Sequence, residues 1–568
     1  MNARFIARVR IVAAVLSAIA AIIIGRLYVL QILDGKAYAG RADAQFVAPQ
    51  EQLTDRDSIY FSDKNGTQII AATLKDGFTL AVNPTKVISA EALYQTINPL
   101  VPLNHDDFLA KATKQGTQYQ VIADHLDTSI GQKLQAEELP GVVLADDRWR
   151  VYPGDSLAAQ DIGFVAYNGN TQEGRYGLES YYENTLARTD GDLYSNFFVQ
   201  LFGGVEHVLQ GQVQTGDIIT TIEPSVEAEL ERTLVDYDNT WHPALAGGII
   251  MNPQNGEIYA MAMSPTFDLN NFGQVADPAT FGNAMVQNVY EMGSIIKPLT
   301  MAAGIDSGAI TATTTYNDTG CITVDAKKIC NFDLKARGVI PMQQILSQSL
   351  NVGASFIATK MGPPVMRDYF ENHYDLGEST GIDLPAEQSG LLKNLSGTQQ
   401  VEFDTASFGQ GIAITPVETI RALATLANGG YLVTPHLVRA IHYDTGLTKT
   451  LNWQKTGPIL KPSTAQTVTQ MLTTVVDTAF TKGMSFEHYS VAAKTGTAQI
   501  ANPAGGGYYT DRYLHSYFGY FPSYDPKFII FLFAYEPVGA PYSSETWGTY
   551  FHDTVQFLIN YYDVPPDR

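Results

Sequence analysis

The chain has few cysteines, a shortage of positive charge and no internal repeat, and each shortage excludes a class of protein. Among 568 residues there are 2 cysteines, too few for a disulfide framework. No His-Glu-x-x-His pattern offers a zinc site, so we expect no metal and no cofactor. Basic residues number 36 against 58 acidic ones, and the net charge of −22 argues against nucleic acid as a partner. Without a repeat at solenoid periods, a repeat architecture is excluded as well.

What remains is a globular protein of several domains. A chain of 568 residues exceeds what one hydrophobic core supports, so we expect roughly two to four domains. Hydrophobic residues make up 45% and charged residues 17%, an ordinary balance for folded domains.

The N-terminal residues are apolar after a basic start. Arg4, Arg8 and Arg10 precede an apolar stretch, residues 11–33, which Arg26 interrupts. As a helix this stretch is roughly 35 Å long, enough for the ~30 Å hydrocarbon core of a bilayer, and Arg26 can snorkel outward. The basic start predicts a cytoplasmic tail at residues 1–10, an anchor at 11–33 and an extracytoplasmic remainder. The alternative is a cleaved signal peptide, although the apolar stretch is long for one.

The two cysteines, Cys321 and Cys330, then fall in a compartment that permits disulfides. The residues between them indicate two short strands about a polar turn, a geometry that a disulfide can bridge. Two unrelated buried thiols are the alternative.

Two turn signals and one apolar run indicate an antiparallel sheet. Asn65-Gly66 and Asn255-Gly256 each separate two apolar segments, the strongest short-range sign of a hairpin. Residues 528–534 are continuously apolar, which predicts a strand buried on both faces, and a final helix is expected from about residue 545 to 561. Strands from both ends of the C-terminal half, around a helical region, predict an α+β fold with one antiparallel sheet covered by helices.

Three short motifs follow one another in the second half of the chain. They are Ser294-Ile295-Ile296-Lys297, Ser349-Leu350-Asn351 and Lys494-Thr495-Gly496-Thr497, with about 55 and about 145 residues between them. Each is common by chance, but their order and spacing together are the signature of serine acyl-transferases that act on penicillin-like and D-alanyl substrates.

Local chemistry gives Ser294 and Lys297 complementary roles. Pro298 cannot lie deep inside a helix, so the helix must start close to Ser294, where backbone N–H groups favour negative charge. Lys297 then lies one turn on, on the same face. A serine hydroxyl needs a base, and a lysine is one only when desolvation or a nearby cation lowers its pKa. We expect Lys494 to be that cation.

The second motif alternates, so Ser349 and Asn351 can enter a cleft from one side while Leu350 enters the core. Ser349 would relay a proton between Lys297 and the leaving amine, and Asn351 would hold Lys297 and the substrate amide. Taken alone, a Ser-x-Asn sequence is more often a helix or turn cap.

The third motif ends a predicted strand, residues 491–494, which enters Thr495, Gly496 and Thr497. Gly496 would leave room for a substrate backbone, and a peptide could then add along this edge as an extra strand.

Taken together, the motifs resemble those of the class B penicillin-binding proteins, the peptidoglycan DD-transpeptidases. Other segments resemble the family across most of the chain: 56–66, 152–153, 177–179, 380–385, 409–411, 427–430 and 518–522. Asp57, Met292 and Ala493 depart from the family pattern, which has glycine, proline and glycine there. The resemblance implies a mixed α/β pedestal domain at 34–235 and a transpeptidase domain with a five-stranded antiparallel sheet at 236–568.

The resemblance also implies roles for the motif residues. Ser294 would attack the penultimate D-alanine carbonyl of a stem peptide, and an amine from a neighbouring stem would take the acyl group. Lys494, Thr495 and Thr497 would recognise the terminal carboxylate of the substrate. Backbone N–H groups of Ser294 and Thr497 would form the oxyanion hole, worth about 3 kcal/mol. β-Lactams would acylate Ser294 as substrate mimics.

Two other functions stay open from the sequence. The first is a hydrolase, either a DD-carboxypeptidase or a serine β-lactamase with Glu387 as the residue that activates water. The second is an idle scaffold or a β-lactam sensor in a wall-synthesis complex. Nothing resembles a glycosyltransferase, so the expected partner is a multispanning membrane glycan polymerase, with other division or elongation proteins. The glycine-rich residues 505–509 slightly favour a septal role.

Overall fold

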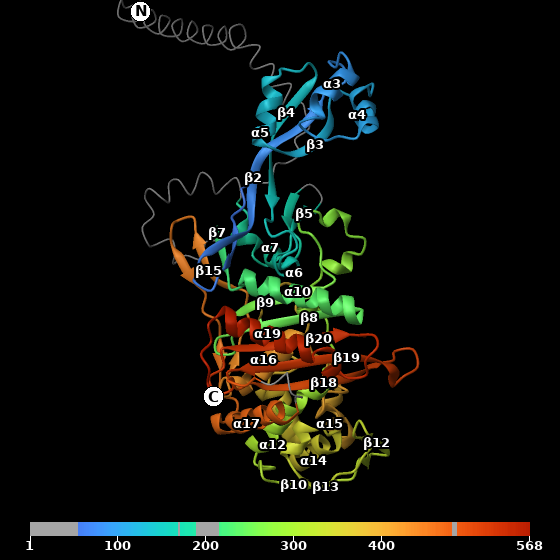
Figure 1. Cartoon of the computed structure of the whole chain (residues 1–568), viewed down its shortest axis with the longest axis vertical. Helices are drawn as coiled ribbons and strands as arrows, with labels where there is room; N and C mark the ends of the chain where they lie inside the picture. Colours follow the sequence, from blue (N-terminus) through green and yellow to red (C-terminus); the bar gives the residue numbers. More distant parts are fainter. Residues whose placement is uncertain (1–54, 169–170, 189–214, 480–485) are drawn as a thin grey trace, which may run out of the picture. The chain divides into compact units, whose positions relative to one another are not determined.

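The computed structural model describes residues 55–168, 171–188, 215–479 and 486–568 (Figure 1). The chain forms two compact units: one contains Leu74–Arg150, and the other contains Asp55–Thr73 and Val151–Arg568. The predicted tail and anchor, residues 1–33, lie outside the described ranges. Within those ranges no helix is both long and apolar enough to cross a bilayer.

The smaller unit is a mixed α/β body. Its elements are the end of β2 (Gln68–Val82), α3 (Ala90–Ile97), α4 (His105–Ala112), β3 (Gln120–Asp127), α5 (Thr128–Ala136) and β4 (Val142–Val151). Strand β2 pairs antiparallel with β3 and also pairs with β4. Leu80 and Val82 of β2 pack with Ile97, Phe108 and Leu134 from the three helices, and this small core holds the unit together.

The larger unit begins with the hairpin predicted at Asn65-Gly66. Strand β1 (Ile59–Ser62) pairs antiparallel with the start of β2, and Gly66 in the turn has φ of +82°, a left-handed conformation that favours glycine. On its other side β1 pairs in parallel with β7 (Gly216–Thr220). Strand β7 in turn pairs with β15 (Val438–Tyr443), and β15 with β16 (Thr448–Thr450). Segments from distant parts of the chain therefore share one sheet.

A five-stranded antiparallel sheet forms the centre of the larger unit, as expected from the family resemblance. Its order is β18 (Ala492–Ala501), β19 (Tyr508–Phe521), β20 (Phe528–Tyr535), β8 (Leu245–Met251) and β9 (Ile258–Ser264). The predicted Asn-Gly turn joins β8 to β9, with Gly256 at φ of +88°. The predicted doubly buried strand is β20, in which every residue but Tyr535 is buried.

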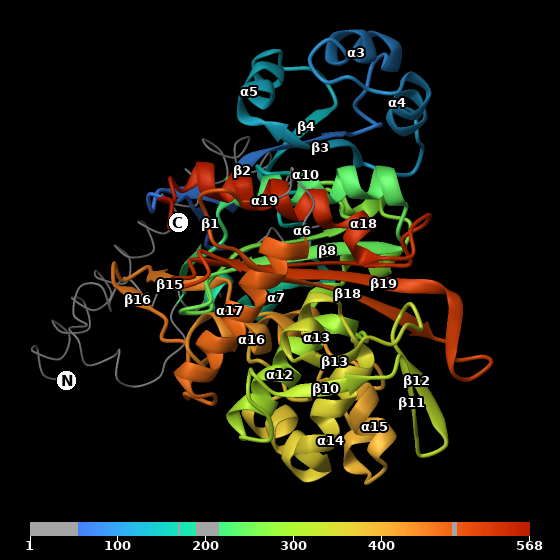
Figure 2. The same cartoon turned by 60° about the horizontal axis from the view of Figure 1, so that its bottom comes forward.

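Helices cover both faces of this sheet, because its strands are apolar on both sides. Figure 2 shows α10 (Pro224–Trp241) and α19 (Gly548–Tyr561) on one face, with α16 (Pro416–Ala427), α17 (Pro462–Ala479) and α12 (Lys297–Asp306) on the other. Along β20, Ile530 and Leu532 pack in the cluster of α10 and α19. The alternate residues Phe531 and Phe533 pack in the cluster of α12 and α16. The sheet is thus the middle layer of three.

The domain boundary predicted between residues 235 and 236 falls inside helix α10. Leu230, Leu234 and Tyr237 of this helix are buried in one cluster with residues of the five-stranded sheet. A helix cannot be divided where one apolar stripe continues across the cut. Helix α10 therefore packs with the five-stranded sheet on both sides of the predicted boundary.

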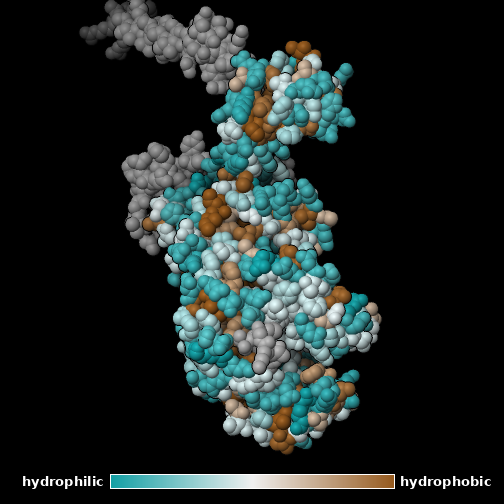
Figure 3. Space-filling view, viewed as in Figure 1, coloured by the Kyte–Doolittle hydropathy of each residue, from teal (hydrophilic) through white to brown (hydrophobic). Residues whose placement is uncertain are grey.

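The rest of the described chain contains further helices and strands. They are α6 (Ala159–Ile162), β5 (Val165–Asn168), β6 (Thr171–Gly174), α7 (Gly177–Tyr181), α8 (Glu183–Leu186), η3 (Phe272–Gln274), η4 (Pro278–Phe281), α11 (Ala284–Gln287), η5 (Gly293–Ile296), β10 (Thr315–Asp318), β11 (Cys321–Val324), β12 (Lys327–Cys330), β13 (Gly338–Pro341), α13 (Gln343–Ser347), α14 (Asn351–Arg367), η6 (Asp368–His373), η7 (Lys393–Ser396), α15 (Gln400–Ala406), β14 (Leu432–Val433), β17 (Lys455–Thr456) and α18 (Ser543–Thr546). The predicted final helix is present as two helices, α18 and α19. The space-filling view shows hydrophilic residues over most of the displayed face, with hydrophobic ones in scattered patches (Figure 3).

Candidate active site

Ser294 lies in a short 3-10 turn, η5, that leads without a break into helix α12. Pro298 is the second residue of α12, where the N–H that proline lacks is not needed. The helix start predicted near Ser294 is confirmed, with its first turn 3-10 rather than α. The turn leaves Ser294 half-buried and places Lys297, 1% exposed, below it.

Lys297 lies at the centre of a compact polar cluster. Its Nζ is 2.9 Å from Ser294 Oγ and 2.8 Å from Asn351 Oδ1. The same atom is 2.7 Å from the carbonyl oxygen of Ser349 and 3.2 Å from its Oγ. The structure therefore brings the first two motifs together on one amine.

The surroundings of Lys297 favour a neutral amine. Burial lowers its pKa well below the ordinary value, and the positive charge of Lys494 lowers it further. A neutral amine has two N–H bonds and one lone pair. The Ser349 carbonyl and Asn351 Oδ1 only accept hydrogen bonds, so they take the two N–H groups. The lone pair is left for a hydroxyl, which lets Lys297 accept the proton of Ser294.

The backbone of the second motif directs its polar groups toward the Lys297 amine. Ser349 has φ of +55°, a left-handed conformation that costs a non-glycine residue about 1–3 kcal/mol and persists where the surroundings enforce it. It turns both the carbonyl and the hydroxyl of Ser349 toward Lys297. Leu350 is fully buried, as predicted, and Asn351 begins helix α14.

A disulfide joins Cys321 to Cys330 across the hairpin of β11 and β12. The two short strands predicted between the cysteines are thus present. Asn351 Nδ2 donates to the carbonyl oxygen of Cys330 at 3.0 Å, so the bridged hairpin ends at the amide that also accepts from Lys297. The sequence gave no sign of this contact, because neither residue belongs to a pattern that includes the other.

Lys494 lies on β18, the edge strand of the five-stranded sheet, and is buried. Burial lowers the pKa of Lys494 to about 7, and its Nζ donates to the Thr495 carbonyl at 3.0 Å. Within the described ranges β18 pairs with a strand on one side alone, β19. Its other edge pairs with no strand in those ranges.

Gly496 is a point of close packing within the chain. A Cβ on this residue would lie 2.3 Å from Ser516 Oγ and 2.9 Å from the Met292 carbonyl oxygen. The space beside Gly496 is thus filled by the chain itself, on the side of the nucleophile. Only glycine allows the segment before Ser294 to pack this closely on β18.

The predicted oxyanion-hole donors, the N–H groups of Ser294 and Thr497, belong to adjacent segments. A Cβ on Gly293 would lie 2.9 Å from the Thr497 carbonyl oxygen, so turn η5 packs directly on β18. Thr497 Oγ1 accepts from the backbone N–H of Ser543, the first residue of α18, at 3.1 Å.

Ser516 is a site residue that the sequence did not suggest. Its buried Oγ donates to the Met292 carbonyl at 2.9 Å, and its own carbonyl accepts from Ser543 Oγ at 2.7 Å. Ser516 thus links the segment before the nucleophile to β19 and α18. The available sign was a lone serine in an apolar strand, since a buried hydroxyl must find a partner.

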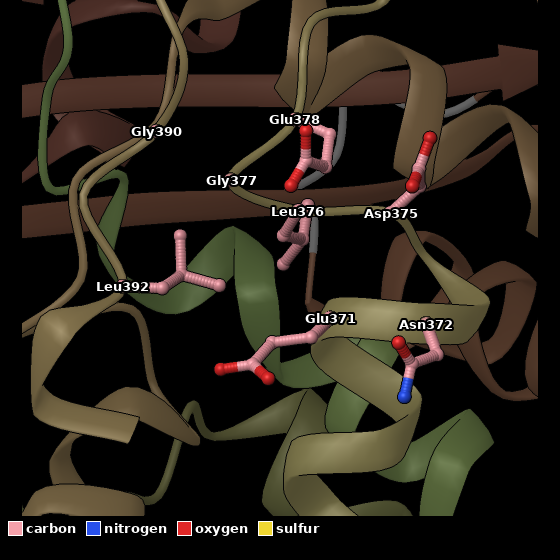
Figure 4. A pocket seen from close by; sticks show the side chains of 8 residues that line it. All are labelled: Glu371, Asn372, Asp375, Leu376, Gly377, Glu378, Gly390 and Leu392. Atoms are coloured by element: carbon pink, nitrogen blue, oxygen red, sulfur yellow. The ribbon is translucent and has the colours of Figure 1, made fainter. Parts of the chain in front are cut away.

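A separate pocket of about 460 Å³ lies beside η6 and contains none of the motif residues (Figure 4). It is lined by Glu371, Asn372, Asp375, Leu376, Gly377, Glu378, Gly390 and Leu392. Arg421 pairs with Asp375 at 2.8 Å. In the part of the chain that the structure describes, no group of three or more His, Cys, Asp or Glu side chains suits a metal ion.

Comparison with known proteins identifies the family. The family description "Penicillin binding protein transpeptidase domain" matches residues 246–553, and "Penicillin-binding Protein dimerisation domain" matches residues 55–212. The chain is 27% identical over 490 residues to the stage V sporulation protein D of Bacillus subtilis, covering 84% of this chain and 74% of that protein. It is 24% identical to the peptidoglycan D,D-transpeptidase FtsI of Buchnera aphidicola, covering 100% of this chain and 97% of the relative.

Solved structures share the fold. Penicillin-binding protein 2X of Streptococcus thermophilus matches with a TM-score of 0.73 and 20% identity, covering 90% of this chain and 81% of that one. Penicillin-binding protein 3 of Mycobacterium tuberculosis, in complex with aztreonam, matches with a TM-score of 0.68 and 23% identity, covering 91% and 98%. Since the transpeptidase family match alone spans more than half of the sequence, the chain belongs to the penicillin-binding proteins, and with its dimerisation domain to their class B.

Proposed function

We propose that Ser294 is the nucleophile of a peptidoglycan DD-transpeptidase and that Lys297 is its base. The observation that carries this is the buried Lys297, whose pKa burial lowers, held 2.9 Å from Ser294 Oγ by two carbonyl acceptors. The lone pair of Lys297 takes the hydroxyl proton as Ser294 Oγ attacks the penultimate D-alanine carbonyl. The C–N bond to the terminal D-alanine breaks, and its amine leaves with a proton. An ester, the acyl-enzyme, remains on Ser294.

The second half of the reaction uses the same groups in reverse. An amine from a neighbouring stem peptide attacks the ester carbonyl, gives up a proton to Lys297, and forms the cross-link as Ser294 regains its hydrogen. Ser349 Oγ, 3.2 Å from Lys297 Nζ, is placed to relay the proton toward the leaving or attacking nitrogen. β-Lactams acylate Ser294 in the same way, since they mimic the D-alanyl-D-alanine end.

Substrate recognition is assigned to β18. The stem peptide adds to its open edge, where the cation of Lys494 and the hydroxyls of Thr495 and Thr497 attract the terminal carboxylate. The N–H groups of Ser294 and Thr497 stabilise the oxyanion of the tetrahedral intermediate, an effect commonly worth about 3 kcal/mol.

The hydrolase alternative has less support because Glu387 is engaged elsewhere. Its Oε1 accepts from the backbone N–H and the hydroxyl of Thr380 at 2.7 and 2.6 Å, and its Oε2 accepts from the Gly381 N–H at 3.2 Å. A carboxylate that fastens its own loop in this way is poorly placed to activate water. The scaffold alternative is disfavoured by the assembled cluster around Lys297.

The membrane part of the proposal rests on the sequence alone. Residues 11–33 anchor the protein in the plasma membrane as a single pass, and the catalytic unit lies outside the cytoplasm. Residues before α10 form a non-catalytic pedestal. A multispanning glycan polymerase supplies the glycan strands, since this chain has no glycosyltransferase motif, and a septal role is slightly favoured.

Intact mass spectrometry tests the proposal. The full chain in detergent is incubated with a penicillin beside a Ser294→Ala variant. We expect one stable adduct on the wild type and none on the variant. Rapid loss of penicillin without a lasting adduct would favour a hydrolase, and neither adduct nor turnover would favour a scaffold.

A further inference from the structure

Glu291, three residues before the proposed nucleophile, has no role in the mechanism above, yet it is held in an unusual way. Its Oε1 accepts from the Gly411 N–H at 3.0 Å and from the Tyr508 hydroxyl at 3.2 Å. Its Oε2 is buried and has no hydrogen-bond partner among the described residues. A carboxylate with one bare, buried oxygen is costly, so the structure must gain something from this side chain.

The Glu291 side chain contributes to a ladder of hydrogen bonds between two antiparallel segments, residues 290–293 and 409–414. Tyr290 and Ile414 exchange two backbone hydrogen bonds of 3.0 Å each at one end. At the other end the Gly293 N–H donates to the Gly409 carbonyl at 3.1 Å. Between these two ends, the hydrogen bond from the Gly411 N–H to Glu291 Oε1 joins the same two segments.

The end of this ladder sets the backbone that precedes Ser294. Gly293 and Gly409 have φ of +67° and +79°, and a Cβ on Gly409 would lie 2.2 Å from the Gly293 carbonyl oxygen. The two glycines therefore pack backbone to backbone, and the next N–H along the chain is that of Ser294, a proposed oxyanion donor. The same loop also accepts from Thr300 of α12, through the Ser407 carbonyl at 2.7 Å.

We propose that Glu291 is a positioning residue for the Ser294 N–H in the oxyanion hole, acting through the loop at Gly409–Gly411. The inference rests on the proposed function, because it needs Ser294 to be acylated. Tyr508, the first residue of β19, extends the link to the strand beside β18, so β19 and the turn that carries Ser294 are joined through one carboxyl group.

The charge of Glu291 modulates the strength of this link. Burial raises its pKa to about 7, although the hydrogen bonds from Gly411 and Tyr508 oppose the rise. A proton placed on Oε2 leaves both hydrogen bonds to Oε1 intact, but the charged form binds the Gly411 N–H more strongly. The groups facing Glu291 are the Tyr508 phenol from β19 and the 409–411 backbone, with Tyr290 beside it. Lys297 and Lys494, whose pKa values burial lowers, are the nearby titratable groups of the proposed catalytic site.

Stopped-flow acylation by a fluorescent penicillin tests the inference on the full chain in detergent, separating the acylation rate k2 from the binding constant K. We expect Glu291→Ala to lower k2 roughly 10- to 100-fold with K changed less than about twofold, because small misplacements of reacting groups cost this much. Glu291→Gln keeps an acceptor for Gly411 and should restore k2 to within about threefold at pH 6.

The pH profile separates positioning from general stability. Lys297 and Lys494 are present in both the wild type and Glu291→Gln, so their titration cancels in the ratio of the two k2 values. As Glu291 ionises, at pH values above 7, the ratio of wild-type to variant k2 should increase. Glu418→Gln is the matched control, since burial raises the pKa of Glu418 to about 7 as well, and it caps helix α16 instead. For Glu418→Gln, the ratio of wild-type to variant k2 should not change with pH.

Each outcome decides between the two proposals. If Ser294 of the wild type is not acylated, the proposed function fails. If it is acylated but Glu291→Ala keeps the wild-type k2, or Glu291→Gln gives a flat ratio like that of Glu418→Gln, the positioning role alone fails. Should Glu291→Ala not fold, the pH profile of Glu291→Gln gives the decision.

Discussion

A buried lysine acts as a base only while it is neutral, and at the residue scale Lys494 helps to keep Lys297 in that state. Burial is the larger cause of the lowered pKa of Lys297, and the charge of Lys494 is the second. Lys494→Ala should therefore raise the pKa of Lys297 and move the rising limb of the acylation rate to higher pH. The measurement is the penicillin acylation rate from pH 5 to 10.

The charge-preserving variant is the control for this prediction. Lys494→Arg keeps a cation near Lys297 and should leave the rising limb closer to that of the wild type. A rising limb at the same pH in Lys494→Ala and the wild type would contradict the electrostatic coupling, whatever happened to substrate affinity.

Gly496 offers a second prediction at this scale. A methyl group there meets Ser516 Oγ and the Met292 carbonyl, so Gly496→Ala should cost about 1–3 kcal/mol of stability and slow acylation. Thermal unfolding and the acylation rate measure the two effects. Gly273→Ala, where a Cβ would meet nothing within 4 Å, should change neither by a comparable amount. Equal behaviour of the two variants would show that the turn can move away from β18.

Individual residues were predictable where the chemistry is local. The pair Ser294 and Lys297 followed from one helical turn, and Pro298 located the helix start. Three features were not predictable: the requirement for glycine at position 496, the hydrogen bond to the Cys330 carbonyl, and the contact made by the Ser516 hydroxyl. Each depends on a contact between segments far apart in the chain, and no periodicity encodes such a contact.

At the scale of elements, one cluster joins α6, α10 and α11 through buried acids. Asp161 Oδ1 accepts from Asn283 Nδ2 at 2.6 Å, and Asn283 Oδ1 caps α11. Glu227 Oε2 accepts from the Met261 N–H at 2.8 Å. Burial and the charges of Asp161 and Glu231 raise the pKa of Glu227 well above 4.5. Asp161 Oδ2 and Glu227 Oε1 are buried without a hydrogen-bond partner among the described residues, which favours the protonated form of these acids.

This cluster makes stability depend on pH. An acid whose pKa is raised on folding binds more protons when folded, so the folded state loses stability as pH rises from about 4.5 toward the folded pKa. Glu227→Gln replaces the protonated acid with a permanent amide donor. It should raise Tm at pH 8 by about 2 °C and flatten the decline of Tm between pH 5 and 8. Parallel Tm curves for the wild type and the variant would count against a raised pKa of Glu227 in the folded state.

Elements were predicted best where a turn or an unbroken apolar run marked them. Both Asn-Gly hairpins and the doubly buried strand are present, because a turn type and complete burial leave their sign within a few residues. The order of the sheet, with β18 at its edge and β8 beside β20, was not contained in any local pattern. It depends on which apolar faces α10 and α17 cover.

At the scale of the whole molecule, the catalytic residues all lie in the unit that contains Val151–Arg568. Replacing residues 1–33 with a cleavable export signal should therefore leave the penicillin acylation rate within about twofold and move the protein from the membrane fraction to the soluble fraction. Fractionation and acylation measure the two parts separately. A chain without residues 1–33 that stayed with the membrane would contradict a single N-terminal anchor. A protein expressed from the complete sequence but found only in the soluble fraction, shortened at its N-terminus, would favour a cleaved signal peptide.

The disulfide between Cys321 and Cys330 also bears on when the hairpin of β11 and β12 is closed during maturation. The end of this hairpin carries the carbonyl that accepts from the Asn351 amide, one hydrogen bond away from the base. In the proposed topology, a newly made chain lacks this bridge in the reducing cytoplasm and acquires it after export. The hairpin beside Asn351 is then closed late in maturation, once the chain has reached an oxidising compartment.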